Sequence, residues 1–235
     1  MDGIATNLTE VRQRIDAACR RAGREPQPVE LIAVSKTFPV SDIAEAVKAG
    51  QQVFGESRLQ EAEAKIDALP ASLSWHFIGG VQRNKVRKIL QKFGVIHAID
   101  SLRLAEYVNG IAGELGHAAE IFLQVNIGGE ASKGGFEPEV LRQEIGKLCA
   151  LDHLRILGLM CIPPEGPDAE SARRWFVSLR ELRDEIEAIS GRQFSQLSMG
   201  MSGDYEVAIE EGATHVRVGT LIFGHRSRRV EGELG

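Results

Sequence analysis

The sequence has little cysteine, and the cysteines it has are not arranged for disulfides or metal binding. Only three occur in 235 residues, Cys19, Cys149 and Cys161. An odd number argues against a disulfide framework, and no CxxC or other metal-ligand spacing is present. The histidines form no HxH or HExxH group either, so the sequence predicts no metal site. A reducing cytoplasm is the expected location.

Long apolar runs and an excess of positive charge are also missing. No segment approaches the ~18 apolar residues of a membrane span. The N-terminal segment 1–23 spaces its apolar residues at helical intervals among charges, unlike a signal peptide. The formal net charge of -5 gives no general attraction to nucleic acid or anionic membranes. The basic cluster at 82–88 is interpreted as a solvated helix face, so we expect neither nucleic acid nor membrane as a partner.

What the sequence does have is a regular alternation of short apolar segments with longer amphipathic ones. Eight segments have the character of buried strands: 30–36, 51–56, 73–79, 95–100, 120–127, 155–162, 194–201 and 215–223. Helical patterns with recognisable first residues lie between them, such as those beginning at Ser101 and Pro138. This alternation, with strands that are apolar on both faces, predicts parallel strands covered by helices.

This pattern predicts the α/β class, as a single (β/α)8 TIM-type barrel with an additional N-terminal helix. An open doubly wound sheet is the alternative. Only 224–235 follow Phe223, too few residues for a full eighth outer helix, so the N-terminal helix is expected to pack outside the barrel near its closure. There is no linker-like stretch, which predicts one domain over 1–235. No interface-forming domain is evident, which favours a monomer.

The carboxyl ends of the predicted strands supply the candidate site, because barrel sites are built there. Lys36 follows the apolar run LIAV at the end of the first strand. It can extend to the rim or pair with Glu56. Alternatively, it is a Schiff-base lysine whose neutral amine attacks an aldehyde.

The last two predicted strands end in LSMGMSGD and RVGTLIFG. Both place glycine beside serine or threonine, so backbone N–H and hydroxyl groups can bind an anion, and the loops after strands 7 and 8 of many barrels bind phosphate. Arg217 lies between valines inside a strand and needs an acceptor. If the ligand is pyridoxal 5'-phosphate (PLP), a guanidinium facing the pyridine nitrogen would disfavour its protonation and weaken the ring as an electron sink.

Several sequence blocks, in one order, together resemble a known family. They are AVSKTFP, FGESRLQE, WHFIGGVQRNK, NIGGEASKGG, GLMCIPP and LSMGMSGDYEVAIEEGATHVRVGTLIFGHR, which run from Leu31 to Arg226. The blocks are similar to those of the pyridoxal phosphate homeostasis protein family, whose single barrel resembles the N-terminal barrel of alanine racemase.

The resemblance implies a role for each matching position. Lys36 would form the internal aldimine with PLP, and Arg217 would face the pyridine nitrogen. The phosphate would be held by the backbone near Met201 together with Ser202, Gly219 and Thr220.

Three further positions carry weaker implications. His76 and Asn84 match positions that the family keeps near the barrel mouth, without an assigned role. Ser57 stands where family members usually have an asparagine that approaches the cofactor, FGES in place of FGEN. Serine is shorter than asparagine, so this contact and the affinity for PLP stay open.

The resemblance implies a cytoplasmic protein that buffers or delivers PLP, with PLP-dependent apo-enzymes as recipients and no robust catalysis. The absence of a second domain would leave the cofactor open to exchange. Two alternatives stay open. A weak racemase-type PLP enzyme would need a second acid/base, for which Tyr205 near the mouth is the candidate, since Tyr107 falls within a predicted helix. A class I aldolase also uses a barrel lysine.

Overall fold

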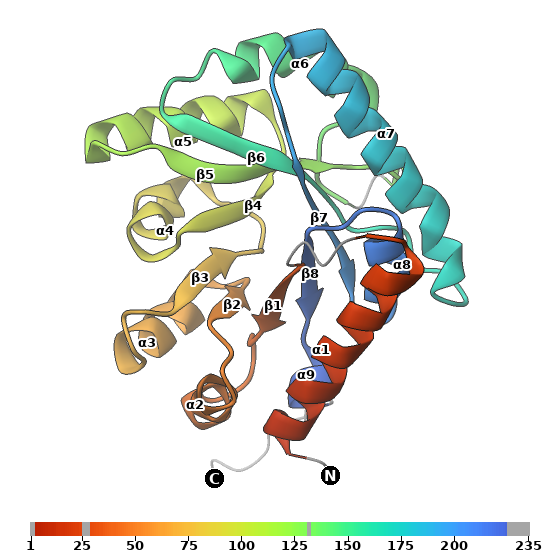
Figure 1. Ribbon diagram of the computed structural model, residues 1–235. Helices are drawn as coiled ribbons and strands as arrows, with labels where there is room; N and C mark the ends of the chain where they lie inside the picture. The colour runs from red at the N-terminus through yellow and green to blue at the C-terminus, as the bar shows by residue number, and fades with distance from the viewer. Residues whose placement is uncertain (1–2, 25–28, 131–132, 225–235) are drawn as a thin grey trace, which may run out of the picture.

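The computed structural model describes residues 3–24, 29–130 and 133–224. Its strands form one closed barrel in chain order, from β1 to β8 (Figure 1). The strands are β1 Glu30–Val34, β2 Val53–Glu56, β3 Ser74–Phe77, β4 Val95–Ile99, β5 Ala119–Val125, β6 Leu154–Cys161, β7 Gln196–Met201 and β8 His215–Val218. All neighbours are parallel, and β8 closes on β1 with Arg217 opposite Ile32. The predicted (β/α)8 barrel is confirmed, and the open sheet is excluded.

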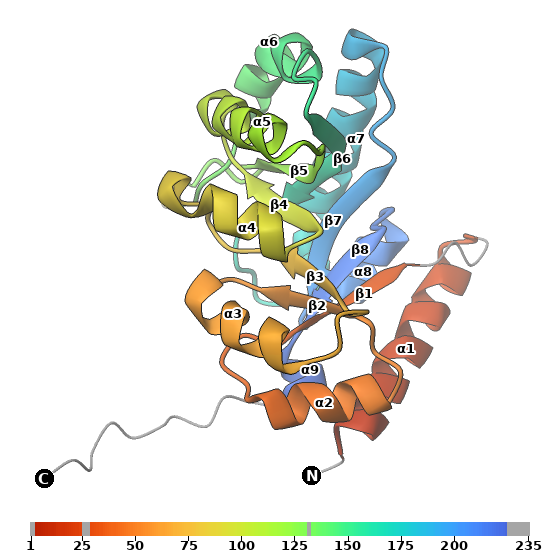
Figure 2. The same cartoon turned by 90° about the vertical axis from the view of Figure 1, so that its left-hand side faces the viewer.

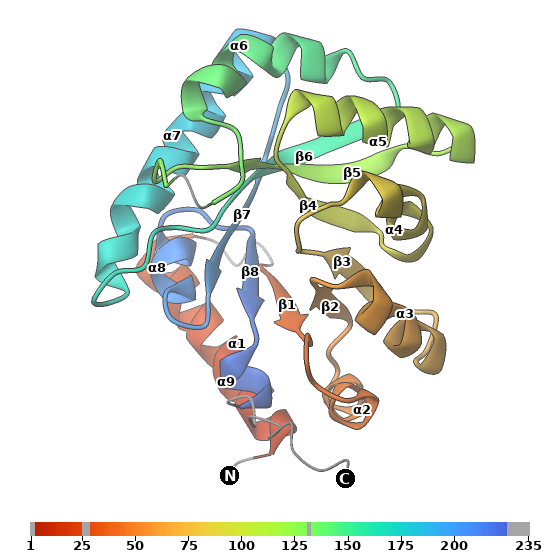
Figure 3. The ribbon, with the colours of Figure 1, turned by 180° about the vertical axis from the view of Figure 1, so that it is seen from behind.

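Helices surround the ring of strands, as Figures 2 and 3 show from two further sides. They are α2 Val40–Lys48, α3 Leu59–Ala68, α4 Val86–Lys92, α5 Leu102–Leu115, α6 Pro138–Cys149, α7 Arg173–Ser190 and α8 Tyr205–Glu210, with 3-10 turns η1 Arg83–Lys85 and η2 Glu170–Ala172. Two expected first turns are confirmed. Ser101 accepts a hydrogen bond from the Leu104 N–H at the start of α5, and Pro138 is the first residue of α6.

The N-terminal helix α1, Ile4–Arg21, lies outside the barrel against α8 and the short helix α9, Thr220–Phe223 (Figure 1). It buries one apolar stripe that includes Leu8, Val11 and Ile15. The expected position of this helix near the barrel closure is confirmed. Within the described residues, no helix combines the length and apolarity that crossing a bilayer requires.

Most predicted strands extend one or two residues past an end of the observed strand, and the last extends five residues too far. The segment 215–223 was expected to be a strand throughout, but β8 ends at Val218 and the following residues form α9. Val218 pairs with Ala33, one residue before β1 ends, so a longer β8 would soon have no backbone to pair with on that side. The chain satisfies its backbone groups in a helical turn instead, despite the β-branched residues that favour a strand.

The barrel separates two apolar regions. The larger lies between the strands and the surrounding helices, and the smaller consists of Val95, Ala98, Phe122 and Met160 from β4, β5 and β6. Polar side chains are buried among the strands as well, namely His76, His97, Ser198, His215 and Arg217. A close-packed interior tolerates such groups only when they are hydrogen-bonded.

Candidate ligand-binding site at the barrel mouth

A pocket of about 280 Å³ lies at the carboxyl ends of β1, β7 and β8. Its lining includes Lys36, Met201, Ser202, Arg217, Gly219 and Thr220. The structure therefore brings together residues that are far apart in the sequence and that were predicted to share a site. Val34, Phe38, Ile78 and Ile162 add apolar surface to the lining.

Lys36 lies in the turn that follows β1 and is half-buried. Its neighbour Thr37 has a φ of 72°, in the left-handed region that β-branched residues rarely adopt. Such a conformation persists only where the surroundings hold it. The contacts of the turn supply that support, because the Thr37 N–H donates to Glu61 on α3.

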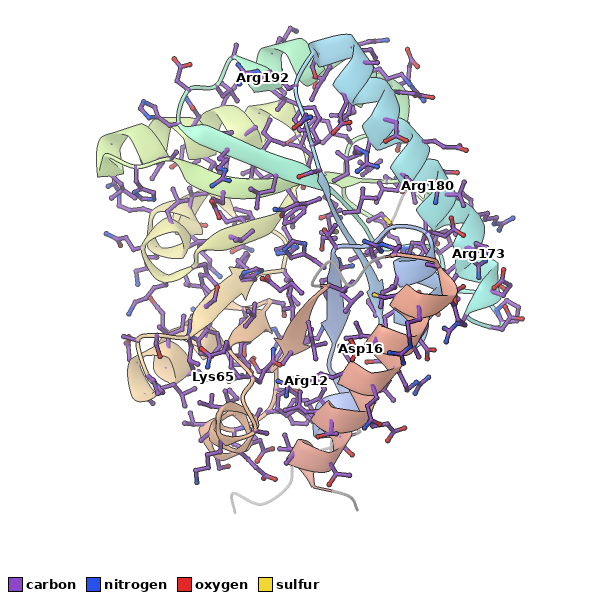
Figure 4. All side chains as sticks on the ribbon, viewed as in Figure 1. Arg12, Asp16, Lys65, Arg173, Arg180 and Arg192 are labelled. Carbon is purple, nitrogen blue, oxygen red and sulfur yellow. The ribbon has the colours of Figure 1, made fainter. Side chains whose placement is uncertain are left out.

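A buried lysine lies directly beneath this turn. Lys65 reaches inward from α3 (Figure 4) and its Nζ donates to Ser35 O at 2.8 Å, Glu56 Oε1 at 2.7 Å and Glu61 Oε1 at 2.6 Å. Ser35 Oγ also donates to Glu56 Oε1, at 2.7 Å. Burial raises the pKa of the Glu56 carboxyl, an effect that the hydrogen bonds from Lys65 and Ser35 oppose. This cluster fixes the turn that carries Lys36.

The opposite wall of the pocket joins two loops. The Gly219 N–H donates to Ser202 Oγ at 3.2 Å, and the Met201 N–H donates to Asp204 Oδ1 at 2.6 Å. A Cβ at Gly219 would lie 3.2 Å from Val34 O, so glycine permits this close approach. The backbone hydrogen bonds of α9 begin with Ile222 N–H to Gly219 O, so the N–H groups of Thr220 and Leu221 precede the first helical bond. Together with the hydroxyls of Ser202 and Thr220, they suit an anionic group.

Arg217 contributes a buried cation to the pocket. The residue is 5% exposed; Nη1 donates to Ser198 Oγ at 2.6 Å and Nη2 to Cys161 O at 2.9 Å. Burial lowers the pKa of the guanidinium, which remains a cation at physiological pH. Within the described part of the chain, these bonds use two of its five N–H groups. The remaining N–H groups of the guanidinium can donate to a ligand.

The remaining sequence candidates do not line this pocket. Ser57 is half-buried and lines a neighbouring depression with Arg58 and Lys85. Asn84 is exposed within η1. His76 lies inside the barrel, where its Nδ1 is 3.0 Å from His97 Nε2.

Neither tyrosine lines the pocket. Tyr205 was expected near the mouth, but its buried ring faces the outer helices and lies under the Arg14 guanidinium of α1, 5.6 Å from the ring centroid. Tyr107 lies under the Arg83 guanidinium at 4.4 Å. That position of Tyr205 was therefore predicted wrongly, because the chain turns into α8 immediately after Asp204.

Sequence reasoning missed two groups of buried polar residues. Lys65 shares a helical spacing of three with Leu59 and Ala62, which are buried, and this position signalled an inward lysine. His97 lies in the otherwise apolar strand VIHAI, every residue of which is buried. A polar residue within such a strand indicates a partner inside the barrel.

Comparisons with known proteins show the family of the chain. The family model described as alanine racemase, N-terminal domain, matches residues 6–227. A relative from Aquifex aeolicus, named a pyridoxal phosphate homeostasis protein, is 44% identical over 220 residues, 93% of this chain and 96% of that protein.

Solved structures show the same fold. PipY of Synechococcus elongatus, in a structure with PLP bound, is 41% identical with a TM-score of 0.83, covering 94% of this chain and 100% of that one. An alanine racemase of Clostridium difficile is 17% identical with a TM-score of 0.72, covering 97% of this chain and 57% of that one. At that identity the likeness concerns the fold alone.

Proposed function

Since this chain belongs to the alanine racemase N-terminal domain family and to the pyridoxal phosphate homeostasis proteins within it, we propose that it binds PLP and acts in intracellular PLP homeostasis, by buffering or delivering the cofactor. One observation carries the proposal. A single pocket combines Lys36, a cradle of glycine and hydroxyl groups, and the buried Arg217.

These residues fit the chemistry of PLP, which supplies a reactive aldehyde and an electron-withdrawing ring when it is bound. Lys36 Nζ would hold the aldehyde carbon covalently. Ser202, Gly219 and Thr220, with the backbone near Met201, would bind the phosphate through N–H and hydroxyl donors. Ser57 would act from the neighbouring depression as an outer contact.

Arg217 supports a role without robust catalysis. A guanidinium can only donate hydrogen bonds, so facing the pyridine nitrogen it would keep a proton off that atom. The ring would then withdraw electrons weakly. The burial of Tyr205 against α1 gives the same support, because a racemase of this barrel type needs a second acid/base at the cofactor.

We also propose a cytoplasmic monomer that exchanges PLP with apo-enzymes. The half-open pocket at the barrel mouth supports exchange, since the cofactor could enter and leave without unfolding of the barrel.

The test of PLP binding is the visible spectrum of the purified protein after addition of PLP, followed by borohydride reduction and peptide mapping. We expect a yellow protein with the pyridoxyl group on Lys36, and loss of the colour in Lys36→Ala. The exposed Lys48 provides the matched control Lys48→Ala, which should stay yellow. A protein that takes up no PLP would contradict the proposal and favour the aldolase-type alternative.

The test of catalysis is the turnover of L-alanine by the PLP-loaded protein, followed on a chiral column. We expect no turnover above that of free PLP. Turnover that disappears in Tyr205→Phe, with the fold and PLP binding retained, would establish the racemase-type alternative.

A further inference from the structure

A chain of polar side chains crosses the barrel interior from Arg217. Arg217 Nη1 is 2.6 Å from Ser198 Oγ, which is 2.8 Å from His97 Nδ1. His97 Nε2 is 3.0 Å from His76 Nδ1, and His76 Nε2 is 3.7 Å from Glu30 Oε1. The last distance is an electrostatic contact rather than a hydrogen bond. The chain thus joins a cation that lines the pocket to a carboxylate at the amino end of β1.

The hydrogen bonds in this chain of side chains have a defined donor-to-acceptor direction. The guanidinium can only donate, so Ser198 Oγ accepts from it. The hydroxyl proton of Ser198, which is fully buried, then has His97 Nδ1 as its acceptor. His97 must carry its proton on Nε2 and donate it to His76 Nδ1. His76 in turn carries its proton on Nε2, pointing at the Glu30 carboxylate.

Hydrogen bonds that ran in the opposite direction, from Glu30 toward Arg217, would be unfavourable at two places. If His97 donated from Nδ1, the buried Ser198 hydroxyl proton would have no acceptor among the described residues. The lone pair on His76 Nε2 would also face the Glu30 carboxylate. Both costs fall on the buried side chains of Ser198 and His76, where a polar atom without a hydrogen-bond partner loses most free energy.

The surroundings keep both rings neutral. Burial, the dominant cause, lowers the pKa of His76 to about 4 and that of His97 well below its ordinary value. His97 is fully buried and stacks on Phe122 of β5, with ring centroids 4.5 Å apart. Arg217 and His215 disfavour a further positive charge on His97.

Glu30 and His215 complete the far end of the chain. His215 Nε2 lies 3.4 Å from Glu30 Oε1, and the interaction with His215 is the largest cause that lowers the pKa of that carboxyl. Within the described residues, no three His, Cys, Asp or Glu side chains are arranged to hold a metal ion, so a metal does not account for this grouping.

We propose that Ser198, His97 and His76 are positioning residues, which hold the Arg217 guanidinium through a chain of protons that all point from Arg217 toward Glu30. Among the described residues, the hydrogen-bond acceptors of the buried cation, Ser198 Oγ and Cys161 O, are both neutral. The aligned hydrogen bonds end at the Glu30 carboxylate on the other side of the barrel, while Asp204 is the carboxylate that favours the charge of Arg217 directly. The effect on a bound cofactor rests on the proposed function, whereas the proton arrangement does not.

The first experiment is long-range 1H–15N NMR of the cofactor-free protein labelled at histidine, between pH 6 and 8. We expect His76 and His97 to show protonated Nε2 and unprotonated Nδ1 throughout this range. The assignment uses the variants His76→Gln and His97→Gln, each of which removes one set of signals. Protonation of Nδ1 in either ring, or titration within this range, would overturn the proposal.

The second experiment breaks the chain at its smallest member with Ser198→Ala. The 15N signal of His97 Nδ1 should move toward that of a nitrogen without a donor, which a purely steric role of Ser198 would not produce. Ser74→Ala makes the same chemical change at an exposed strand residue and should leave the signal in place. An unchanged His97 signal in a folded Ser198→Ala protein would overturn the proposal.

The cofactor provides the functional readout. In Ser198→Ala, we expect about tenfold weaker PLP binding and a shifted midpoint in the pH titration of the bound chromophore. If both are unchanged, Arg217 does not depend on the chain for its position. If the wild-type protein binds no PLP, the proposed function fails, and the NMR result still decides the proton arrangement.

Discussion

Lys65 supports the turn that carries Lys36, because it donates to the Ser35 carbonyl oxygen and to Glu56. Its side chain is 6% exposed and that of Glu56 is fully buried, so neither charge has water as an alternative partner. Such a pair gives modest net stability relative to apolar residues, but breaking it leaves an uncompensated buried charge. Removal of one partner should therefore destabilise the protein far more than removal of both.

Replacement of Lys65 tests this directly. Lys65→Met should lower the free energy of unfolding by about 3–5 kcal/mol in urea titrations. The double variant Glu56→Gln/Lys65→Met should recover part of that loss because it removes the stranded carboxylate. Lys88→Met is the matched control; Lys88 is 66% exposed and lies 3.4 Å from Glu63, so its loss should cost less than ~1 kcal/mol. Equal effects at both lysines would contradict the burial argument.

The buried histidines predict a loss of stability in mild acid. The pKa of His76 falls from 6.5 to about 4 on folding, so the unfolded chain binds more protons in this range. The stabilisation from each neutral ring is complete above pH ~6.5. It is lost as the pH falls toward 4, at up to ~1.4 kcal/mol per pH unit.

The measurement is the free energy of unfolding at several pH values for the wild type and His97→Phe. The variant should lose stability less steeply below pH ~6.5, because one fewer ring must be charged on unfolding. Glu56, whose pKa is raised, acts in the opposite sense but equally in both proteins. His117→Gln, at an exposed position, should keep the wild-type slope. Parallel curves for wild type and His97→Phe would refute this account.

Among the elements, α1 is held to the barrel by two kinds of contact. Its apolar stripe is buried, and its arginines form ion pairs with α8, such as Arg21 Nε with Glu210 at 2.8 Å. The Arg21 side chain is 50% exposed. Solvent-exposed ion pairs contribute little, whereas burial of a leucine side chain contributes a few kcal/mol. The stripe should therefore dominate the docking of this helix.

Two substitutions on α1 separate these contributions. Leu8 is fully buried, so Leu8→Ala should destabilise the protein by about 2–5 kcal/mol. Arg21→Met should cost less than ~1 kcal/mol, and high salt should abolish the difference from wild type. Urea titrations in low and high salt measure both. A larger effect at Arg21 than at Leu8 would mean that charge holds the helix in place.

The described surface of the protein has few large exposed apolar side chains, namely Val140, Ile162, Ile189 and Met201. Ile162 and Met201 line the pocket, and the other two lie on separate helices, α6 and α7. Stable homodimers bury contiguous and mainly apolar surfaces. The described part of the chain offers no such surface.

Sedimentation equilibrium at micromolar concentration should therefore give a mass near 25.7 kDa, with and without PLP. A mass near twice this value would contradict the prediction. In that case the interface would have to be polar, and its affinity should fall as salt is added.

Much of the architecture could be predicted because it depends on periodicity. Eight apolar segments and the helices between them are local patterns, and parallel strands of this kind close into a barrel. Lys36, Ser202 and Gly219 could be placed at one mouth because they follow strand ends. Arg217 could be placed there because it lies inside the last strand, two residues before Gly219. The end of β8 could not be predicted. The composition of Thr220–Phe223 favours a strand, but these residues form a helix because β1 ends beside them and leaves no partner strand.

The order of the strands, the end of the barrel that carries the pocket and the lysine in that pocket follow from local patterns along the chain. Which buried polar groups meet depends on how the barrel closes in three dimensions. Lys65 joins Glu56 from a neighbouring helix, and His97 joins Ser198 across 101 positions of the chain. Apolar burial is non-directional and leaves a periodic trace in the sequence. A buried hydrogen bond depends on the position of two atoms to within a few tenths of an ångström, and closure of the barrel sets those positions.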